Sequence, residues 1–261
     1  MTVTRPKVVG IARVFNQEAF LQRWLDWMAK LVDEVVVIDD GSWDRTAAIL
    51  EAHPLVTRVV RKPRSAMTEV RDLNRLTEMA LEREAKWIVR LDTDEVLDNR
   101  IFDRLDSLLA AEDVAEYRFR KYWLWRSEEQ IRLDRPDKFA QWNAARFFRA
   151  DANATWPHPD GAPWLRTAKV LTRRRGLRPQ TGNAGVEGIG GRIVEIEDVV
   201  LIHYAAVSYE EMVWKHIRYA LGERQEHPRR KPDDIATWAA SLLDESTLEL
   251  GPVPEEWKPL A

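Results

Sequence analysis

The composition of the chain limits the classes of protein to which it can belong. It has 261 residues, of which 45% are hydrophobic, enough for a substantial core. A net charge of -3 excludes an overall bias toward nucleic acid or anionic membranes, and the absence of cysteine excludes disulfides and thiolate metal sites. Residues 1–7 contain no apolar leader, and no window reaches the roughly 20 apolar residues that span a bilayer, so the sequence predicts a soluble, cytoplasmic protein.

The first half of the chain alternates apolar runs with segments of helical periodicity. The apolar runs end in polar turns, as strands do, and amphipathic stretches follow them. The predicted strands are 8–12, 34–38, 56–61 and 87–91, and the predicted helices are 19–31, 44–52 and 65–84. Strands that alternate with helices predict a mostly parallel sheet with helices on both faces.

The second half has a more mixed pattern, which predicts antiparallel additions to the sheet. The predicted elements are a helix at 102–110, strands at 117–125, 144–149 and 199–202, and a helix that opens at Ser208. A break between Pro228 and Pro232 favours a helical extension at the C-terminus, which we assign to residues 223–261. This extension packs on the core or forms a homodimer, and the sequence leaves both alternatives open.

An acidic segment follows the fourth predicted strand. Residues 92–95 read Asp-Thr-Asp-Glu, and on an extended backbone Asp92 and Asp94 project to the same side. At about 5 Å and an effective dielectric of about 20, two such carboxylates repel by roughly 3 kcal/mol. A divalent cation is the compensation that we expect.

Two further polar clusters follow the first and second predicted strands. They cover residues 13–18 and 39–42. Because ligands of parallel α/β sheets bind outside the carboxyl ends of the strands, the three clusters predict one ligand site at that edge.

The three clusters together resemble family 2 glycosyltransferases of the GT-A fold, in particular compact bacterial or phage-type members. Residues 12–18 read Ala-Arg-Val-Phe-Asn-Gln-Glu, residues 37–46 read Val-Ile-Asp-Asp-Gly-Ser-Trp-Asp-Arg-Thr, and residues 91–95 read Leu-Asp-Thr-Asp-Glu. The resemblance implies a Rossmann-like, mostly parallel sheet flanked by helices, with antiparallel additions in the C-terminal half. It also implies one domain over residues 1–222, in which residues 1–110 bind the nucleotide sugar and residues 111–222 form the acceptor side.

The resemblance further implies a metal corner at the Asp-x-Asp segment. Asp94 is expected to ligate Mn²⁺ or Mg²⁺, and Asp92 to contact the ribose or the metal. His203 resembles the late histidine that completes the metal site in many GT-A enzymes. Glu95 either supports this site or faces solvent or an arginine.

The nucleotide is expected to contact the ends of the first three strands. Asp39 is favoured over Asp40 as the residue that accepts a hydrogen bond from the base or ribose, although an Asp-Gly-Ser sequence is also a common turn that caps a helix. The nucleotide-binding candidates implied by the resemblance are Ala12, Arg13, Asn16, Asp39, Asp40, Arg64, Arg71 and Asp92.

The catalytic base is the least defined part of the prediction. Asp160 and Asp137 compete for this role, and His158 is a further candidate. None of them lies in the Glu-Asp base motif of the family, so both the base and the stereochemistry stay open. Trp156 and Trp164 lie in predicted loops and are candidates for stacking on a sugar, whereas Trp24, Trp27 and Trp214 are expected to pack in the core.

The predicted function is metal-dependent, hexosyltransferase-like transfer from a nucleotide-diphosphate sugar, with UDP favoured over GDP and inversion as the family-level expectation. The acceptor is a saccharide, a glycolipid or another hydroxyl compound, and modified DNA is not favoured. One alternative is a nucleotidyltransferase that acts on sugar phosphates, although residues 13–18 lack the glycine that a triphosphate cradle requires. The other is a catalytically inactive nucleotide- or carbohydrate-binding protein.

Overall fold

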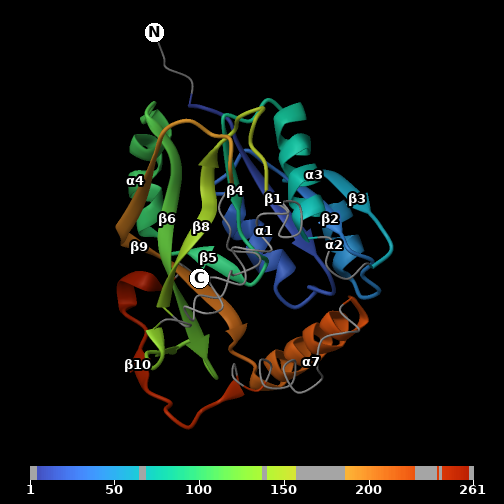
Figure 1. The fold of residues 1–261 in the computed structure, drawn as a ribbon, viewed down its shortest axis with the longest axis vertical. Helices are drawn as coiled ribbons and strands as arrows, with labels where there is room; N and C mark the ends of the chain where they lie inside the picture. Colours follow the sequence, from blue (N-terminus) through green and yellow to red (C-terminus); the bar gives the residue numbers. More distant parts are fainter. Residues whose placement is uncertain are drawn as a thin grey trace, which may run out of the picture.

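The computed structural model of the protein describes residues 5–64, 69–136, 140–156, 186–226, 240 and 243–258. The strands are β1 (Val8–Val14), β2 (Glu34–Asp39), β3 (Val56–Arg61), β4 (Trp87–Arg90), β5 (Glu95–Leu97), β6 (Val114–Trp125), β7 (Gln130–Arg132), β8 (Ala140–Arg149), β9 (Arg192–Ala206) and β10 (Leu250–Pro252). The helices are α1 (Leu21–Met28), α2 (Thr46–Ala52), α3 (Glu69–Glu82), α4 (Arg100–Ala110), α7 (Tyr209–Glu226) and the 3₁₀ helix η1 (Glu255–Trp257). Figure 1 shows their arrangement.

The sheet is parallel in its N-terminal half and mixed beyond it. Along the sheet the strands follow the order β10-β7-β6-β8-β4-β1-β2-β3, and β9 pairs with β5 and β6. β1 is parallel to β2 and β4, and β2 is parallel to β3, whereas β8 is antiparallel to β4 and β6. The predicted fold class, a mostly parallel sheet with antiparallel additions in the C-terminal half, is confirmed.

The parallel strands β1, β2 and β4 consist mainly of apolar residues because both of their faces are buried. Along β2, Val35 and Val37 pack on one side with the core residues of α1 and α4, whereas Val36 and Ile38 pack on the other with those of α3. This side-to-side alternation follows from the period of two along a strand. The prediction that helices cover both faces is therefore confirmed, and Trp24 and Trp27 are buried on α1 as expected.

The described part of the C-terminal extension is only partly helical. The proposed boundary at residue 222 falls inside α7, and residues 243–258 contribute β10 and the short η1. β10 pairs antiparallel with β7, so this segment completes the edge of the sheet. The expectation of helix is wrong for residues 250–252 because a three-residue strand with a proline at its end carries no periodic signal.

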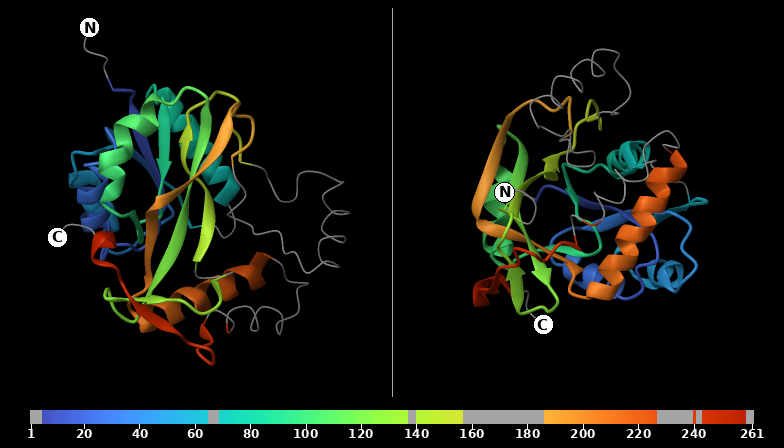
Figure 2. Two further views of the ribbon diagram at one scale, coloured as in Figure 1. Left: turned by 90° about the vertical axis from the view of Figure 1, so that its left-hand side faces the viewer. Right: turned by 60° about the horizontal axis from the view of Figure 1, so that its bottom comes forward.

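α7 lies across the carboxyl ends of the parallel strands. In Figure 1 it runs below β1, β2 and β3, and the right-hand view of Figure 2 shows it crossing that end of the sheet. The hydroxyl of Ser208 accepts from the backbone N–H of Glu211, which caps the helix at the residue where the sequence predicts its start. No helix in the described ranges has the length and hydropathy needed to cross a membrane.

Candidate active site

The segment after β4 is a tight turn rather than an extended continuation of the strand. β4 ends at Arg90, and the backbone N–H of Glu95 donates to the carbonyl of Asp92 at 2.8 Å. The predicted alternation of Asp92 and Asp94 is therefore wrong, because the turn interrupts the extended backbone that it requires. The side chain of Asp92 is 51% exposed and that of Asp94 only 9%, so the two carboxylates have different surroundings.

Asp94 contacts two groups that come from distant parts of the chain. Its Oδ2 lies 3.4 Å from Nε2 of His203, on β9, and 2.6 Å from Nζ of Lys215, on α7. The antiparallel pairing of β5 with β9 sets Glu95 opposite His203, which brings the histidine to the turn. Burial raises the pKa of Asp94, but Lys215 and His203 outweigh burial and hold this pKa well below its usual range. Asp94 is therefore ionised.

His203 is buried beside the edge of the Trp123 ring, with the two ring centroids 4.2 Å apart. Burial lowers the pKa of His203, although the neighbouring Asp94 opposes this effect. A lowered pKa favours the uncharged imidazole, which is the form that ligates metals. Its Nδ1 atom is buried and has no hydrogen-bond partner within the described part of the chain.

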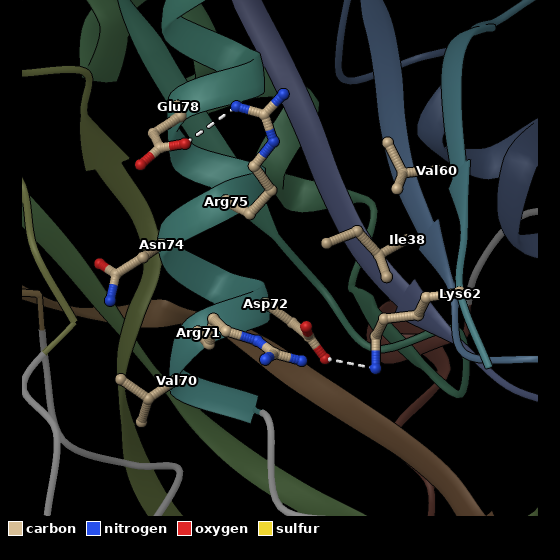
Figure 3. Close-up of a pocket in the computed structure, with 9 residues that line it drawn as sticks. All are labelled: Ile38, Val60, Lys62, Val70, Arg71, Asp72, Asn74, Arg75 and Glu78. Atoms are coloured by element: carbon tan, nitrogen blue, oxygen red, sulfur yellow. Dashed lines mark hydrogen bonds and ion pairs between the residues drawn. The ribbon is translucent and has the colours of Figure 1, made fainter. Parts of the chain in front are cut away.

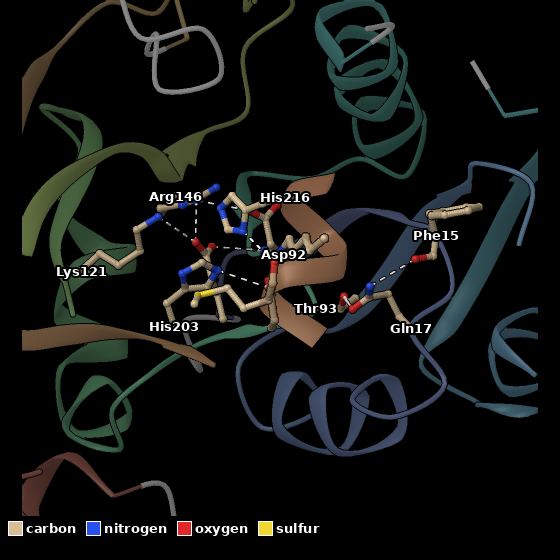
Figure 4. Close-up of polar contacts among 12 residues, drawn as sticks. Phe15, Gln17, Asp92, Thr93, Lys121, Arg146, His203 and His216 are labelled. Atoms are coloured by element: carbon tan, nitrogen blue, oxygen red, sulfur yellow. Dashed lines mark hydrogen bonds and ion pairs between the residues drawn. The ribbon is translucent and has the colours of Figure 1, made fainter. Parts of the chain in front are cut away.

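Glu95 is paired with cations and excluded from solvent. Nη2 of Arg146, on β8, lies 2.8 Å from Oε1 of Glu95 and 3.5 Å from Oδ2 of Asp92. Nζ of Lys121, on β6, lies 3.4 Å from the same Glu95 oxygen. Figure 4 shows Arg146, Lys121 and His203 converging on the turn. Glu95 was expected to support the metal site, to face solvent or to face an arginine. It contacts Arg146 and is not exposed to solvent.

The same cations act on Asp92 in spite of its exposure. Desolvation by the surrounding protein raises the pKa of Asp92. The positive charges of Arg146 and Arg90 outweigh this effect and lower the pKa to about 2. Because half of the side chain is exposed, solvent weakens these ion pairs. Lys121 loses hydration in the same cluster, and this desolvation lowers its pKa.

Protein cations therefore compensate the acidic turn in this structure. Arg146 and Lys121 lie against Glu95, and Lys215 lies against Asp94. The sequence gives no signal for these three residues as partners. Their contacts join positions that lie 51, 26 and 121 residues apart.

The atoms of Asp94 and His203 nevertheless have a spacing that fits a divalent cation. Neighbouring ligands about 2.1 Å from one octahedral ion stand about 3.0 Å apart, close to the 3.4 Å between Oδ2 and Nε2. No group of three or more His, Asp or Glu side chains suited to a metal occurs in the described ranges. Mg²⁺ is commonly bound by only one or two protein ligands, and phosphate and water fill its other coordination positions.

The turns after β1 and β2 are tied to each other by side chains. The backbone N–H of Asn16 donates to the hydroxyl of Ser42 at 2.9 Å, and the N–H of Trp43 donates to Oδ1 of Asn16 at 3.0 Å. Asp39 is fully buried, accepts from the N–H of Ser42 at 2.9 Å and pairs with Arg61. Asp39 and Asn16 thus hold the shape of the strand ends, as the turn interpretation of Asp39 predicts.

A second ion-pair network lies where β1, β2 and β3 meet α3. Asp72 accepts from Lys62 at 3.1 Å and lies 3.5 Å from Arg13, and Lys62 also pairs with Asp40. A cavity of about 640 Å³ opens beside this network, with Ile38 in its wall (Figure 3). Lys62 and Asp72 were not predicted, because in the sequence they resemble ordinary surface residues.

Further predicted residues border these strand ends. Ala12 is buried in β1, and the guanidinium of Arg64 stacks on the ring of Phe15, 3.5 Å from its centroid. Arg71 lines the cavity with Lys62 and Asp72 (Figure 3). Ala12, Arg13, Asp40, Arg64 and Arg71 therefore gather at the carboxyl ends of β1, β2 and β3.

The candidates for the acceptor side are only partly placed. Asp137, His158, Asp160 and Trp164 lie outside the described residues. Trp156 lies outside any strand or helix, as predicted, but it is buried: it is 4% exposed, packs on Phe148 and donates from Nε1 to Thr77 at 3.0 Å. The expected packing of Trp214 is also wrong, because this side chain is 55% exposed on α7.

Comparisons with known proteins give a family and several partial similarities. The model of glycosyl transferase family 2 matches residues 11–167, which is more than half of the chain. Two uncharacterized proteins, Mb3815c of Mycobacterium bovis and Rv3786c of Mycobacterium tuberculosis, are each 35% identical over 101 residues. Each match covers 36% of this chain, which spans about a quarter (25%) of the length of these relatives.

Two solved structures are similar at low sequence identity. A structure of GalNAc-T7 with UDP, GalNAc and Mn²⁺ is 10% identical, with a TM-score of 0.42, over 79% of this chain and 45% of that protein. A structure of 4-diphosphocytidyl-2C-methyl-D-erythritol synthase is 14% identical, with a TM-score of 0.40, over 74% of this chain and 90% of that protein.

The family match includes all three strand-end clusters, the acidic turn among them, and the resemblance to family 2 glycosyltransferases is confirmed. The chain belongs to glycosyl transferase family 2.

Proposed function

We propose that the protein transfers a sugar from a nucleoside diphosphate donor to a hydroxyl acceptor. The observation that carries this proposal is the buried pair of Asp94 and His203, with atoms 3.4 Å apart at the carboxyl edge of a family 2 glycosyltransferase sheet. Such an edge is where parallel α/β sheets bind nucleotides. A UDP-linked hexose is the donor that we favour.

Asp94 and His203 are the residues that would hold a divalent cation, Mn²⁺ or Mg²⁺. When bound, this cation supplies positive charge that stabilises the leaving diphosphate. Asp94 is the stronger ligand of the two because its lowered pKa keeps the carboxylate negatively charged. His203 would ligate through Nε2 with its proton on Nδ1, and no acceptor for that proton lies within the described residues.

The nucleotide would lie over the ends of β1, β2 and β3. Arg13, Lys62 and Arg71 bring positive charge to this edge, and Asp40 and Asp92 offer carboxylate oxygens for ribose hydroxyls. These are roles that we assign by position. Ala12 and Arg64 border the same edge, and Asp39 and Asn16 keep it in shape.

Transfer in this scheme is one displacement at the anomeric carbon. The acceptor oxygen attacks that carbon, a base takes the hydroxyl proton, and the nucleoside diphosphate leaves with the electrons of its bond, which inverts the configuration. Asp160, Asp137 and His158 are the proposed candidates for the base. A saccharide or a glycolipid is the acceptor class that we favour.

A panel of donors tests the proposed function. We expect one class of nucleotide sugar, UDP-linked first, to raise the melting temperature by several degrees in the presence of Mn²⁺ and to release its nucleoside diphosphate. Thermal shift and a coupled assay for released diphosphate measure the two effects. Stabilisation only by a nucleoside triphosphate with a sugar phosphate would indicate a nucleotidyltransferase, and binding without release would indicate an inactive binding protein.

A further inference from the structure

Lys215 occupies the position at Asp94 where a cation is needed. Its Nζ lies 2.6 Å from Oδ2 of Asp94, the same oxygen that faces Nε2 of His203. The lysine side chain is 27% exposed, so its contact with Asp94 is partly shielded from solvent. The ammonium group is thus a built-in counter-charge for the carboxylate.

A divalent cation and the ammonium group compete for one carboxylate oxygen. Both are positive, and a cation held by Oδ2 of Asp94 would stand beside Nζ of Lys215 in the observed position. Their repulsion is strong because Asp94 and His203 are buried and solvent screens the charges poorly. Lys215 therefore has to leave Asp94 before a cation binds there.

The side chain of Lys215 is able to make this move without unfolding the helix. A lysine carries its charge on a flexible four-carbon stem with three rotatable donors. Lys215 lies on α7, which crosses the end of the sheet where the strand-end residues gather (Figure 2). A phosphate oxygen of a donor at this edge would offer the displaced ammonium group a new partner.

We propose that Lys215 holds the cation position at Asp94 while the donor site is empty, and that it moves onto the donor diphosphate when metal and donor bind. This inference rests on the proposed function. It makes Lys215 a residue that keeps metal affinity low in the free protein and raises the affinity for the nucleotide in the complex. A lysine that only supports the fold would leave both affinities unchanged in a folded variant.

The test measures two affinities in the full chain. Mn²⁺ binding to the donor-free protein is followed by the electron paramagnetic resonance signal of free Mn²⁺, and UDP binding at saturating Mn²⁺ is followed by calorimetry. The variants are Lys215→Met, with Lys215→Gln as a second neutral change and Lys215→Arg as a change that keeps the charge. Arg218→Met is the matched control, because Arg218 is an exposed cation on the same helix.

We expect Lys215→Met to bind Mn²⁺ about tenfold more tightly than the wild type and UDP about tenfold more weakly. Lys215→Arg and Arg218→Met should keep the wild-type affinity for Mn²⁺. If both neutral variants bind Mn²⁺ no more tightly, or bind UDP no more weakly, the inference is overturned. If the wild type itself shows no Mn²⁺-dependent UDP binding, the proposed donor site is wrong. The inference about Lys215 then fails with it, without any measurement on the variants.

Discussion

Replacement of Asp94 by Asn is expected to lower donor turnover by at least about 10³-fold, because it removes the only ionised ligand of the proposed metal pair. The amide keeps the size of the side chain but neither its charge nor its attraction for a hard cation. Turnover is measured as release of nucleoside diphosphate from the donor that the panel selects. The loss should be accompanied by loss of Mn²⁺ stimulation.

The matched control for this variant is Asp106→Asn, which removes an exposed carboxylate on α4. It should leave both turnover and Mn²⁺ stimulation at the wild-type level. A melting curve of Asp94→Asn verifies that the variant is folded, since Lys215 and His203 lose their partner. A folded Asp94→Asn protein with normal metal-stimulated turnover would show that the metal is held elsewhere.

Replacement of Arg146 by Met is expected to destabilise the fold by about 3 kcal/mol, because it leaves a buried carboxylate with a weaker partner. The side chain of Arg146 is 2% exposed and that of Glu95 is 0% exposed. After the change, Glu95 retains Lys121 at 3.4 Å, which places the expected loss at the lower end of the range for broken buried ion pairs. Urea denaturation at neutral pH measures the free energy of unfolding.

A double variant tests whether the broken Arg146–Glu95 pair causes the loss of stability. Arg146→Met combined with Glu95→Gln should be less destabilised than Arg146→Met alone, because the buried carboxylate that lost Arg146 is then replaced by a neutral amide. Arg192→Met breaks a pair with Asp113 whose side chains are 59% and 66% exposed, and it should cost less than about 1 kcal/mol. Equal losses for Arg146→Met and Arg192→Met would contradict the role assigned to the buried pair.

The parallel half of the fold was predictable because its strands are mainly apolar runs. β1 to β4 lie where the runs at 8–12, 34–38, 56–61 and 87–91 place them, each within two residues at either end. β5, β7 and β10 have three residues each, and so short a segment shows no periodicity. Their positions depend on pairing with strands that are distant in the sequence.

The acidic residues of the candidate site could be predicted from the sequence, whereas the basic residues could not. A carboxylate pair at a strand end is a local pattern, and so the sequence pointed to Asp94. Arg146 and Lys215 lie in segments that resemble solvated strand and helix faces, and only the register of β8 and the path of α7 bring them to the turn. The sequence therefore pointed to a metal ion as a source of positive charge and did not reveal the protein cations at the same turn.

Calorimetric titration of the donor's nucleoside diphosphate into the wild-type protein tests the central claim most directly. With Mn²⁺ present we predict binding at least about tenfold tighter than in the presence of a chelator, because Asp94 and His203 alone offer the diphosphate no positive charge. The same difference should be absent in Asp94→Asn. Equal affinity with and without Mn²⁺, or no binding by any nucleoside diphosphate of the panel, would contradict a metal-assisted donor site at this turn.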